Sequence, residues 1–200
     1  MNLALEFKNL EKKMLTEKFQ NNEGLSNEVG YYIFAYNPKD ELTVRDYIND
    51  LQKKFTFEKV GFNLKVINIY EVILKIIDSF NYRDNFMQME KEEGITEVAE
   101  QINNILEMNE DENLIVREVE DQLNNQKAEI FITGIGQVFP LLRAHKILNT
   151  MHQIIDQYPV VMFYPGKFDG LSLRMFNEIN DHNYYRAFPL NKNWGNPNAD

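Results

Sequence analysis

The sequence predicts an α/β fold of three layers, in which helices cover both faces of a central, mostly parallel sheet of about four to five strands. Apolar runs of strand length alternate along the chain with stretches whose apolar residues recur every three or four positions, as in amphipathic helices. Three of the runs are continuously apolar, which is typical of parallel strands buried on both faces.

Length and composition fit one globular unit, and we expect residues 1–200 to form a single domain. Hydrophobic residues make up 44% and charged residues 26%, which excludes wholesale disorder. No apolar run approaches the roughly 18 residues of a membrane span, and no secretory signal is recognisable, so we expect a cytoplasmic protein without membrane contact. The absence of cysteine excludes disulfides, thiolate metal sites and cysteine nucleophiles.

The first third of the chain predicts two helices and a strand. A helix begins near Leu3, and turn-forming residues at 21–24 end it. The run 31–36 (YYIFAY) predicts a buried strand that ends at Asn37-Pro38. Asp40 is then expected to cap the next helix. The side chains expected on the inner side of that helix are Leu42, Val44, Tyr47, Ile48 and Leu51.

The remaining elements alternate in the same way. A second strand at 64–69 runs directly into a helix at 70–80, and a third strand follows at 128–134. Pro140, which is tolerated in the first turn of a helix, is expected to open a helix that ends near Asp156. The fourth strand is predicted at 158–164, and a short terminal strand is expected within 184–190.

The negative charge of the chain lies in one segment. The net charge is −10, but residues 84–126 contain 13 acidic and 2 basic residues, a net of −11, and the rest is close to neutral. This segment predicts an acidic insertion of two or three amphipathic, peripheral helices, broken at Gly94 and at 109–113. An acidic chain is poorly suited to grip nucleic acid, so no direct nucleic-acid contact is expected.

Two glycines stand where the third strand meets a helix, the position used by dinucleotide and phosphate sites. Gly134 and Gly136 lack the third glycine of the dinucleotide pattern, whose place is taken by Phe139, and no Gly-Lys-Ser/Thr follows. The pattern favours a tight turn and close helix packing, with a degenerate anion site as the weaker interpretation.

The histidines and Arg143 do not assemble a recognisable centre. His145 and His152 are seven residues apart, whereas metal pairs on helices usually sit at i and i+4, so no metal site and no cofactor are expected. Arg143 is placed one turn into the predicted 140–156 helix, where it either pairs with a carboxylate or accepts an anionic partner.

The segment after the fourth strand is the most distinctive. Residues 164–170 (YPGKFDG) follow a parallel strand at its carboxyl end, where open α/β sheets place their sites. Two glycines, a proline and Asp169 predict a fixed turn. We expect a buried network that holds the C-terminal segment on the core, and a binding surface is the alternative. No nucleophile–base pair stands out, so no catalytic residue is predicted. The network residues are Asp169, Arg174, Tyr184 and Arg186.

Several blocks resemble the BrxB family of bacteriophage exclusion (BREX) systems. These blocks are YYIFAYNPKDEL at 31–42, ITGIGQVFPLLRAHKILN at 132–149, FYPGKFDGLSLRMF at 163–176 and DHNYYRAF at 181–188. The resemblance covers nearly the whole chain and is weakest in the acidic segment. It implies a small component of an antiviral defence complex that binds the phosphatase-like component PglZ, and it carries over no catalytic residue.

Two function classes are favoured by the sequence, and a third, a direct DNA-binding subunit, is disfavoured by the negative charge. The first is a non-catalytic assembly module that acts by protein–protein interaction. The second is a nucleotide- or phosphate-binding enzyme subunit that uses the carboxyl edge of the sheet, with Gly134, Gly136, Arg143, Asp169 and Arg174.

Overall fold

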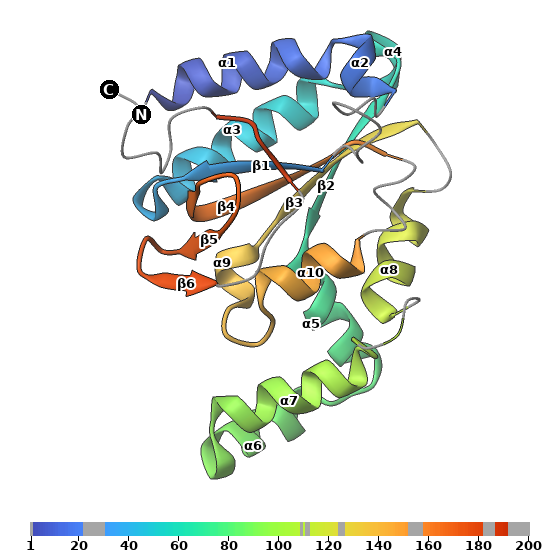
Figure 1. The fold of residues 1–200 in the computed structure, drawn as a ribbon. Coiled ribbons are helices and arrows are strands. Elements are labelled where there is room, and N and C mark those ends of the chain that lie inside the picture. Colours follow the sequence, from blue (N-terminus) through green and yellow to red (C-terminus); the bar gives the residue numbers. More distant parts are fainter. Residues whose placement is uncertain are drawn as a thin grey trace.

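The computed structural model describes residues 2–21, 31–108, 110, 113–123, 127–151, 158–181 and 187–191. It confirms the predicted α/β class, with a central, mostly parallel sheet between helices (Figure 1). The strands of the main sheet lie in the order β2-β3-β4-β1-β7, and neighbours along this order are parallel. Their bounds are β1 Tyr31–Tyr36, β2 Asn63–Asn68, β3 Ala128–Thr133, β4 Val160–Phe168 and β7 Phe188–Pro189.

The sheet separates two apolar cores, because successive side chains of a strand point to opposite faces. In β1, Tyr32 and Phe34 face one core, whereas Ile33 and Ala35 face the other. Strand β3 divides in the same way, with Phe131 in the first core and its neighbours in the second. These strands are therefore apolar on both faces, which is why their sequences are continuous apolar runs.

Helices cover the first face with an aromatic layer. Phe7 packs on Phe34 with ring centroids 4.9 Å apart, and Phe34 packs on Phe163 at 5.1 Å. Figure 1 shows α1 and α3 side by side over this face of the sheet. The helices on this side and in the connection to β2 are α1 Leu3–Met14, α2 Glu17–Gln20, α3 Glu41–Lys54 and α4 Phe57–Val60.

Aliphatic side chains dominate the helices on the second face. Helix α5 buries four isoleucines and one valine, and α8, α9 and α10 add their apolar sides to the same core. The sheet thus lies between two helical layers, as the sequence predicts. The helices of this layer are α5 Ile69–Ser79, α8 Leu114–Leu123, α9 Ile135–Val138 and α10 Ala144–Thr150.

The predicted start of the 140–156 helix at Pro140 is wrong, although α10 lies within that range. Helix α9 ends at Val138, and Phe139 is extended, with φ −69° and ψ 135°, as the residue before a proline usually is. The chain then reaches α10, whose N-cap is Arg143. Because Pro140 has no N–H and restricts Phe139, it separates two helices instead of opening one. Residues 152–157, the end of the predicted helix, lie outside the described residues.

The expected cap and inner face of α3 also need correction. A single 3₁₀ turn, η1 (Pro38–Asp40), precedes the helix, and the side chain of Asn37 accepts a hydrogen bond from the Lys39 N–H at 3.1 Å. Asp40 is the N-cap of α3 but makes no capping bond. Val44, Ile48 and Leu51 form the buried stripe as predicted, but Leu42 is exposed.

The described part of the acidic segment forms three helices, which differ in burial. Helix α8 buries Ile115, Val116, Val119 and Leu123 in the second core, so the expectation that the whole segment is peripheral is wrong. Helices α6 (Arg83–Glu93) and α7 (Ile95–Ile105) pack on each other and extend beyond α5 and α10 (Figure 1).

Strand β4 continues through Pro165 and Gly166, where the sequence predicts a turn. Residues 166–168 leave the parallel sheet and pair antiparallel with β5 (Leu173–Met175), which pairs with β6 (Ile179–Asp181). A Cβ on Gly166 would lie 2.1 Å from the Arg174 carbonyl oxygen, so close pairing with β5 requires glycine there. Of the expected terminal strand, β7 is the described part, and it pairs with β1.

Candidate functional site at the carboxyl edge of the sheet

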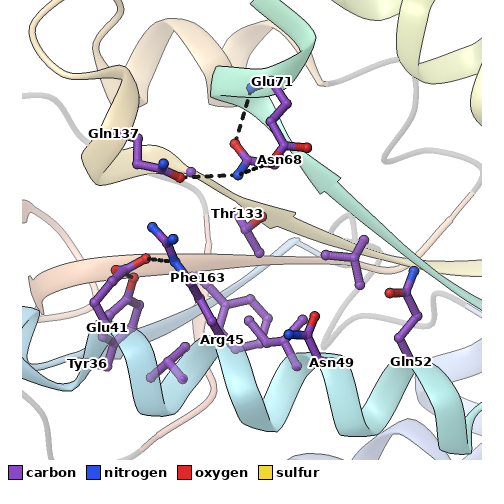
Figure 2. A pocket seen from close by; sticks show the side chains of 14 residues that line it. Tyr36, Glu41, Arg45, Asn49, Gln52, Asn68, Glu71, Thr133, Gln137 and Phe163 are labelled. Carbon is purple, nitrogen blue, oxygen red and sulfur yellow. Dashed lines mark hydrogen bonds and ion pairs between the residues drawn. The ribbon is translucent and has the colours of Figure 1, made fainter.

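A hollow of about 300 Å³ opens at the carboxyl ends of β1, β2 and β3 (Figure 2). The helix after β1 packs on the first core, whereas the helices after β2 and β3 pack on the second, so the chain leaves this edge in opposite directions. Open α/β sheets bind ligands in such crevices. The hollow is lined by Tyr36, Glu41, Val44, Arg45, Ile48, Asn49, Gln52, Val66, Asn68, Glu71, Thr133, Gly134, Gln137 and Phe163.

One wall of the hollow is a chain of three bonded side chains. Glu41 and Arg45 are one turn apart on α3, and Arg45 Nε donates to Glu41 Oε1 at 2.8 Å. The hydroxyl of Tyr36, at the end of β1, donates to the other oxygen of Glu41. Burial, reinforced by this bond, raises the pKa of Tyr36, which therefore stays neutral. Glu41 thus compensates the charge of Arg45 (Figure 2).

The opposite wall is organised by Asn68, the last residue of β2. Its Oδ1 accepts hydrogen bonds from the backbone N–H groups of Tyr70 at 3.0 Å and Glu71 at 3.4 Å, which caps α5. Its Nδ2 donates to Gln137 Oε1 of α9 at 3.2 Å. Asn68 therefore joins the starts of two helices, and its donors and acceptor are used within the chain.

Gly134 and Gly136 allow close packing around the wall that Asn68 organises. Gly134 has φ +78°, and a Cβ there would lie 2.0 Å from Asn68 Oδ1. A Cβ on Gly136 would lie 2.9 Å from Pro165 Cγ and 3.1 Å from a ring carbon of Phe176. These contacts match the tight turn and close packing that the sequence favours, and Gly134, unlike Gly136, also lines the hollow.

Arg143 lies elsewhere. It is the N-cap of α10, its side chain is exposed, and it is not among the residues that line the hollow. Because the loop at 139–143 replaces the predicted helix turn, Arg143 is not brought to the strand ends. His145 is half-buried in the first turn of α10, and His152 lies outside the described residues.

The expected buried network around Asp169 is not formed by its two described members, because both side chains are exposed. Asp169 Oδ1 accepts from the N–H groups of Leu171 at 2.8 Å and Ser172 at 2.7 Å, which fixes the turn between β4 and β5. Arg174 Nε instead donates to Asn180 Oδ1 at 2.7 Å across the β5–β6 pair. The other two predicted members, Tyr184 and Arg186, lie outside the described residues.

The ionisation of Asp169 follows from this turn. Partial burial acts to raise its pKa, but the hydrogen bonds from Ser172 and Leu171 stabilise the carboxylate and hold the pKa below its usual value.

The physical reason why Asp169 and Arg174 do not form the predicted network is the register of the β4–β5 pair. Arg174 stands opposite Lys167 and points outward between two buried neighbours on β5.

A buried carboxyl group that sequence reasoning missed lies at the other end of β3. Glu129 is 1% exposed, and neither of its carboxyl oxygens has a hydrogen-bond partner within the described residues. Burial raises its pKa to about 9, against a small opposing effect of Lys127. Its signal was present in the sequence, because Glu129 interrupts an otherwise apolar strand. It does not line the hollow.

The polar residues of the hollow were missed as well. Asn68 directly before a helix is an N-cap signal, and Glu41 and Arg45 have the i, i+4 spacing of a helical ion pair. Nothing in the sequence says that these groups meet across the sheet. Within the described residues, no group of three or more His, Cys, Asp or Glu side chains could hold a metal ion. None of the helices in the described ranges combines the length and the apolar character of a membrane span.

Comparison with known proteins identifies the family. The family model for BREX protein BrxB matches residues 65–190. A BREX protein BrxB from Bacillus cereus (strain H3081.97) is 38% identical over 178 residues, which cover 89% of this chain and 92% of that relative. A BREX protein BrxB from Escherichia coli O9:H4 (strain HS) is 25% identical over 181 residues, which cover 90% of this chain and 88% of that relative. No solved structure matches the chain. The chain therefore belongs to the BrxB family and is a component of a BREX defence system.

Proposed function

We propose that this chain is a non-catalytic assembly component of its BREX complex, that it acts in the cytoplasm by protein–protein interaction, and that PglZ is its partner. Membership of the family supports a place in a system of several proteins. The observation that carries the proposal is the pair of helices α6 and α7, here called the arm (residues 83–105), which lies beyond the layers that cover the sheet (Figure 1).

The arm adds three buried side chains, Phe86, Val98 and Ile102, to the second core, which is fewer than α8 alone adds. Strands β2 and β3 are parallel neighbours, a connection that usually needs one crossover helix, yet α5, α6, α7 and α8 all lie between them. Helix α6 has 11 residues and buries only Phe86, whereas α8 buries four side chains in 10 residues. Since α5 and α8 already cover the sheet, the stability of the core does not account for α6.

The surface of the arm suits a protein partner, as does that of its root, the turn at 80–82 where α5 ends and α6 begins. Residues 83–105 contain six acidic and two basic residues, a net of −4. Large apolar side chains are exposed among these charges. Exposed aromatic and Met side chains are enriched where proteins bind each other. The exposed apolar residues at the arm and its root are Phe80, Tyr82, Met87 and Ile95.

The hollow at the carboxyl edge favours a second candidate, a nucleotide- or phosphate-binding enzyme subunit. Its position is that of ligand sites in open α/β sheets. Against this candidate, the guanidinium of Arg45 is already paired with Glu41, and Glu71 adds a second acidic group to the lining. A nucleotide at 100 times its Kd should stabilise the fold by about 2.7 kcal/mol. An unchanged melting temperature with ATP, ADP and inorganic phosphate would rule this candidate out.

The direct test of the assembly function is co-expression of the tagged chain with PglZ from the same BREX system. We expect the two proteins to co-elute from affinity and size-exclusion columns at a fixed ratio. Elution of PglZ without the chain at micromolar concentrations would contradict the proposal. The purified chain alone should show no ATPase, nuclease or methyltransferase turnover, and turnover that disappears in Asp169→Ala would contradict the non-catalytic part.

A further inference from the structure

Two exposed aromatic rings stand at the root of the arm, where α5 ends and α6 begins. Phe80 is 45% exposed and Tyr82 is 41% exposed, and their rings are nearly parallel, with centroids 5.8 Å apart and planes at 18°. Tyr82 also packs edge-on against the buried ring of Phe86, with centroids 6.4 Å apart. The pair is thus seated on the buried side chain of α6, while both residues remain more than 40% exposed.

The backbone between the rings is a well-defined helix C-terminus. The Tyr82 N–H donates to the carbonyl of Ile77 at 3.2 Å, and the Asn81 N–H donates to the carbonyl of Asp78 at 3.0 Å. Asn81 has φ +56°, the left-handed conformation that this motif requires. Because the turn is fixed before any partner arrives, binding through these rings loses little conformational entropy.

The charges around the rings define what such a pair would bind. Arg83, the nearest basic residue in sequence, is paired with Asp78 through two bonds of 2.7 and 2.5 Å. Asp84 is exposed one residue further on, and the arm carries a net charge of −4. Aromatic faces beside carboxylates attract a guanidinium or ammonium group, which stacks on the rings and pairs with the acid.

We infer that the Phe80–Tyr82 pair is the anchor by which the arm docks on a basic surface of a protein partner in the BREX complex, with an arginine or lysine side chain of that partner over the rings. This inference rests on the proposed assembly function and names the surface that performs it. Charge complementarity excludes the other occupants. A second copy of the arm would bring one net charge of −4 against another, and the nucleic-acid backbone is itself anionic.

The test expresses the tagged chain with the other components of its BREX system, PglZ included, and identifies the captured components by mass spectrometry. The test variant is Phe80→Ala/Tyr82→Ala, and the matched control is Phe57→Ala, an aromatic residue of α4 that is 54% exposed. We expect the double variant to capture about tenfold less of the component that the wild type captures, or even less, at an unchanged melting temperature. The control should capture as much as the wild type.

A second variant keeps the rings and changes the charge. Asp84→Lys should weaken capture, and added salt should weaken capture of the wild type more than that of this variant. If the wild type captures PglZ and both variants capture the same amount, the anchor is refuted while the assembly function stands. If the wild type captures another BREX component, which the double variant loses, the anchor stands and PglZ is the wrong partner. If the wild type captures none, both proposals fail.

Discussion

The carboxyl edge of the sheet and the arm are both rich in polar side chains, but they use these groups differently. At the edge, Asn68 caps one helix and bonds to another, and Glu41 holds both Tyr36 and Arg45. In the arm, carboxylates such as Asp84 face solvent beside exposed apolar residues.

The difference separates two uses of polarity. A polar group whose bonds are satisfied within the chain mainly stabilises the fold, whereas an exposed one beside aromatic rings remains available to a partner. Substitutions at the edge should therefore change stability first, and substitutions in the arm should change binding first.

The largest effect is expected at Gly134. Gly134→Ala combines a strained φ of +78° with a Cβ that would lie 2.0 Å from Asn68 Oδ1. Gly61→Ala is the matched control, because Gly61 has φ +82° and nothing within 4 Å of its Cβ position. The control should lose about 1–2 kcal/mol of unfolding free energy, and Gly134→Ala should lose about 1–3 kcal/mol more. Equal losses in chemical denaturation would show that the wall around Asn68 yields readily.

Apolar strands and helix caps can be predicted from the sequence, whereas polar contacts between elements cannot. Continuous apolar runs such as 31–36 and 128–133 predict buried parallel strands, because a sheet with two covered faces needs apolar side chains on both. Local signals also indicate single caps, such as Asn68 before α5. They do not predict that Glu41 of α3 receives the hydroxyl of Tyr36, because that contact depends on how β1 and α3 pack.

The errors share one physical cause, namely that a local pattern has more than one tertiary solution. Pro140 is compatible with a helix start and with a break, and here it separates α9 from α10. Asp169 and Arg174 can form a pair only if the hairpin register brings them together, but Arg174 stands opposite Lys167. The differing burial of α6 and α8 likewise depends on which helix reaches the sheet.

Glu129 is the opposite case, because its carboxyl group is buried and has no hydrogen-bond partner in the described part of the chain. The unfolded chain ionises this carboxyl near pH 4.5 and the folded chain near pH 9, so between these values the folded state binds more protons. The contribution of Glu129 to stability is therefore full below about pH 4.5 and is lost as the pH rises toward 9.

The variant Glu129→Gln should remove this pH dependence. Its unfolding free energy should exceed that of the wild type by a few kcal/mol at pH 8, since each pH unit within the window changes the balance by up to about 1.4 kcal/mol. Urea denaturation at pH 5 and pH 8 measures the difference. A variant that is less stable than the wild type at pH 8 would mean that the carboxylate has a partner in solution.

Substitution of Asp169 should have a smaller effect, and that effect should be on stability and not on binding, as at the carboxyl edge. Asp169→Ala removes the acceptor for the N–H groups of Leu171 and Ser172 and should lower the unfolding free energy by about 1 kcal/mol, whereas Asp169→Asn keeps an acceptor and should lose less. Because hydrogen bonds hold the pKa of this carboxyl below its usual 3.8, the stabilisation is present above that pH and is lost as the pH falls further. Capture of the BREX partner should persist. Loss of capture at an unchanged melting temperature would make the hairpin a partner surface.

The smallest effect on stability is expected at Arg83, in the turn that carries the aromatic pair. Its ion pair with Asp78 is strong in geometry, but the two side chains are 51% and 47% exposed, and solvent screens such pairs. Arg83→Gln should therefore leave the unfolding free energy nearly unchanged. The same substitution makes the net charge of the arm −5, so capture of a basic partner should stay equal or increase. Reduced capture at an unchanged melting temperature would mean that Arg83 itself contacts the partner. The arm would then bind through a group that is already paired within the chain, which would contradict the contrast between the arm and the carboxyl edge.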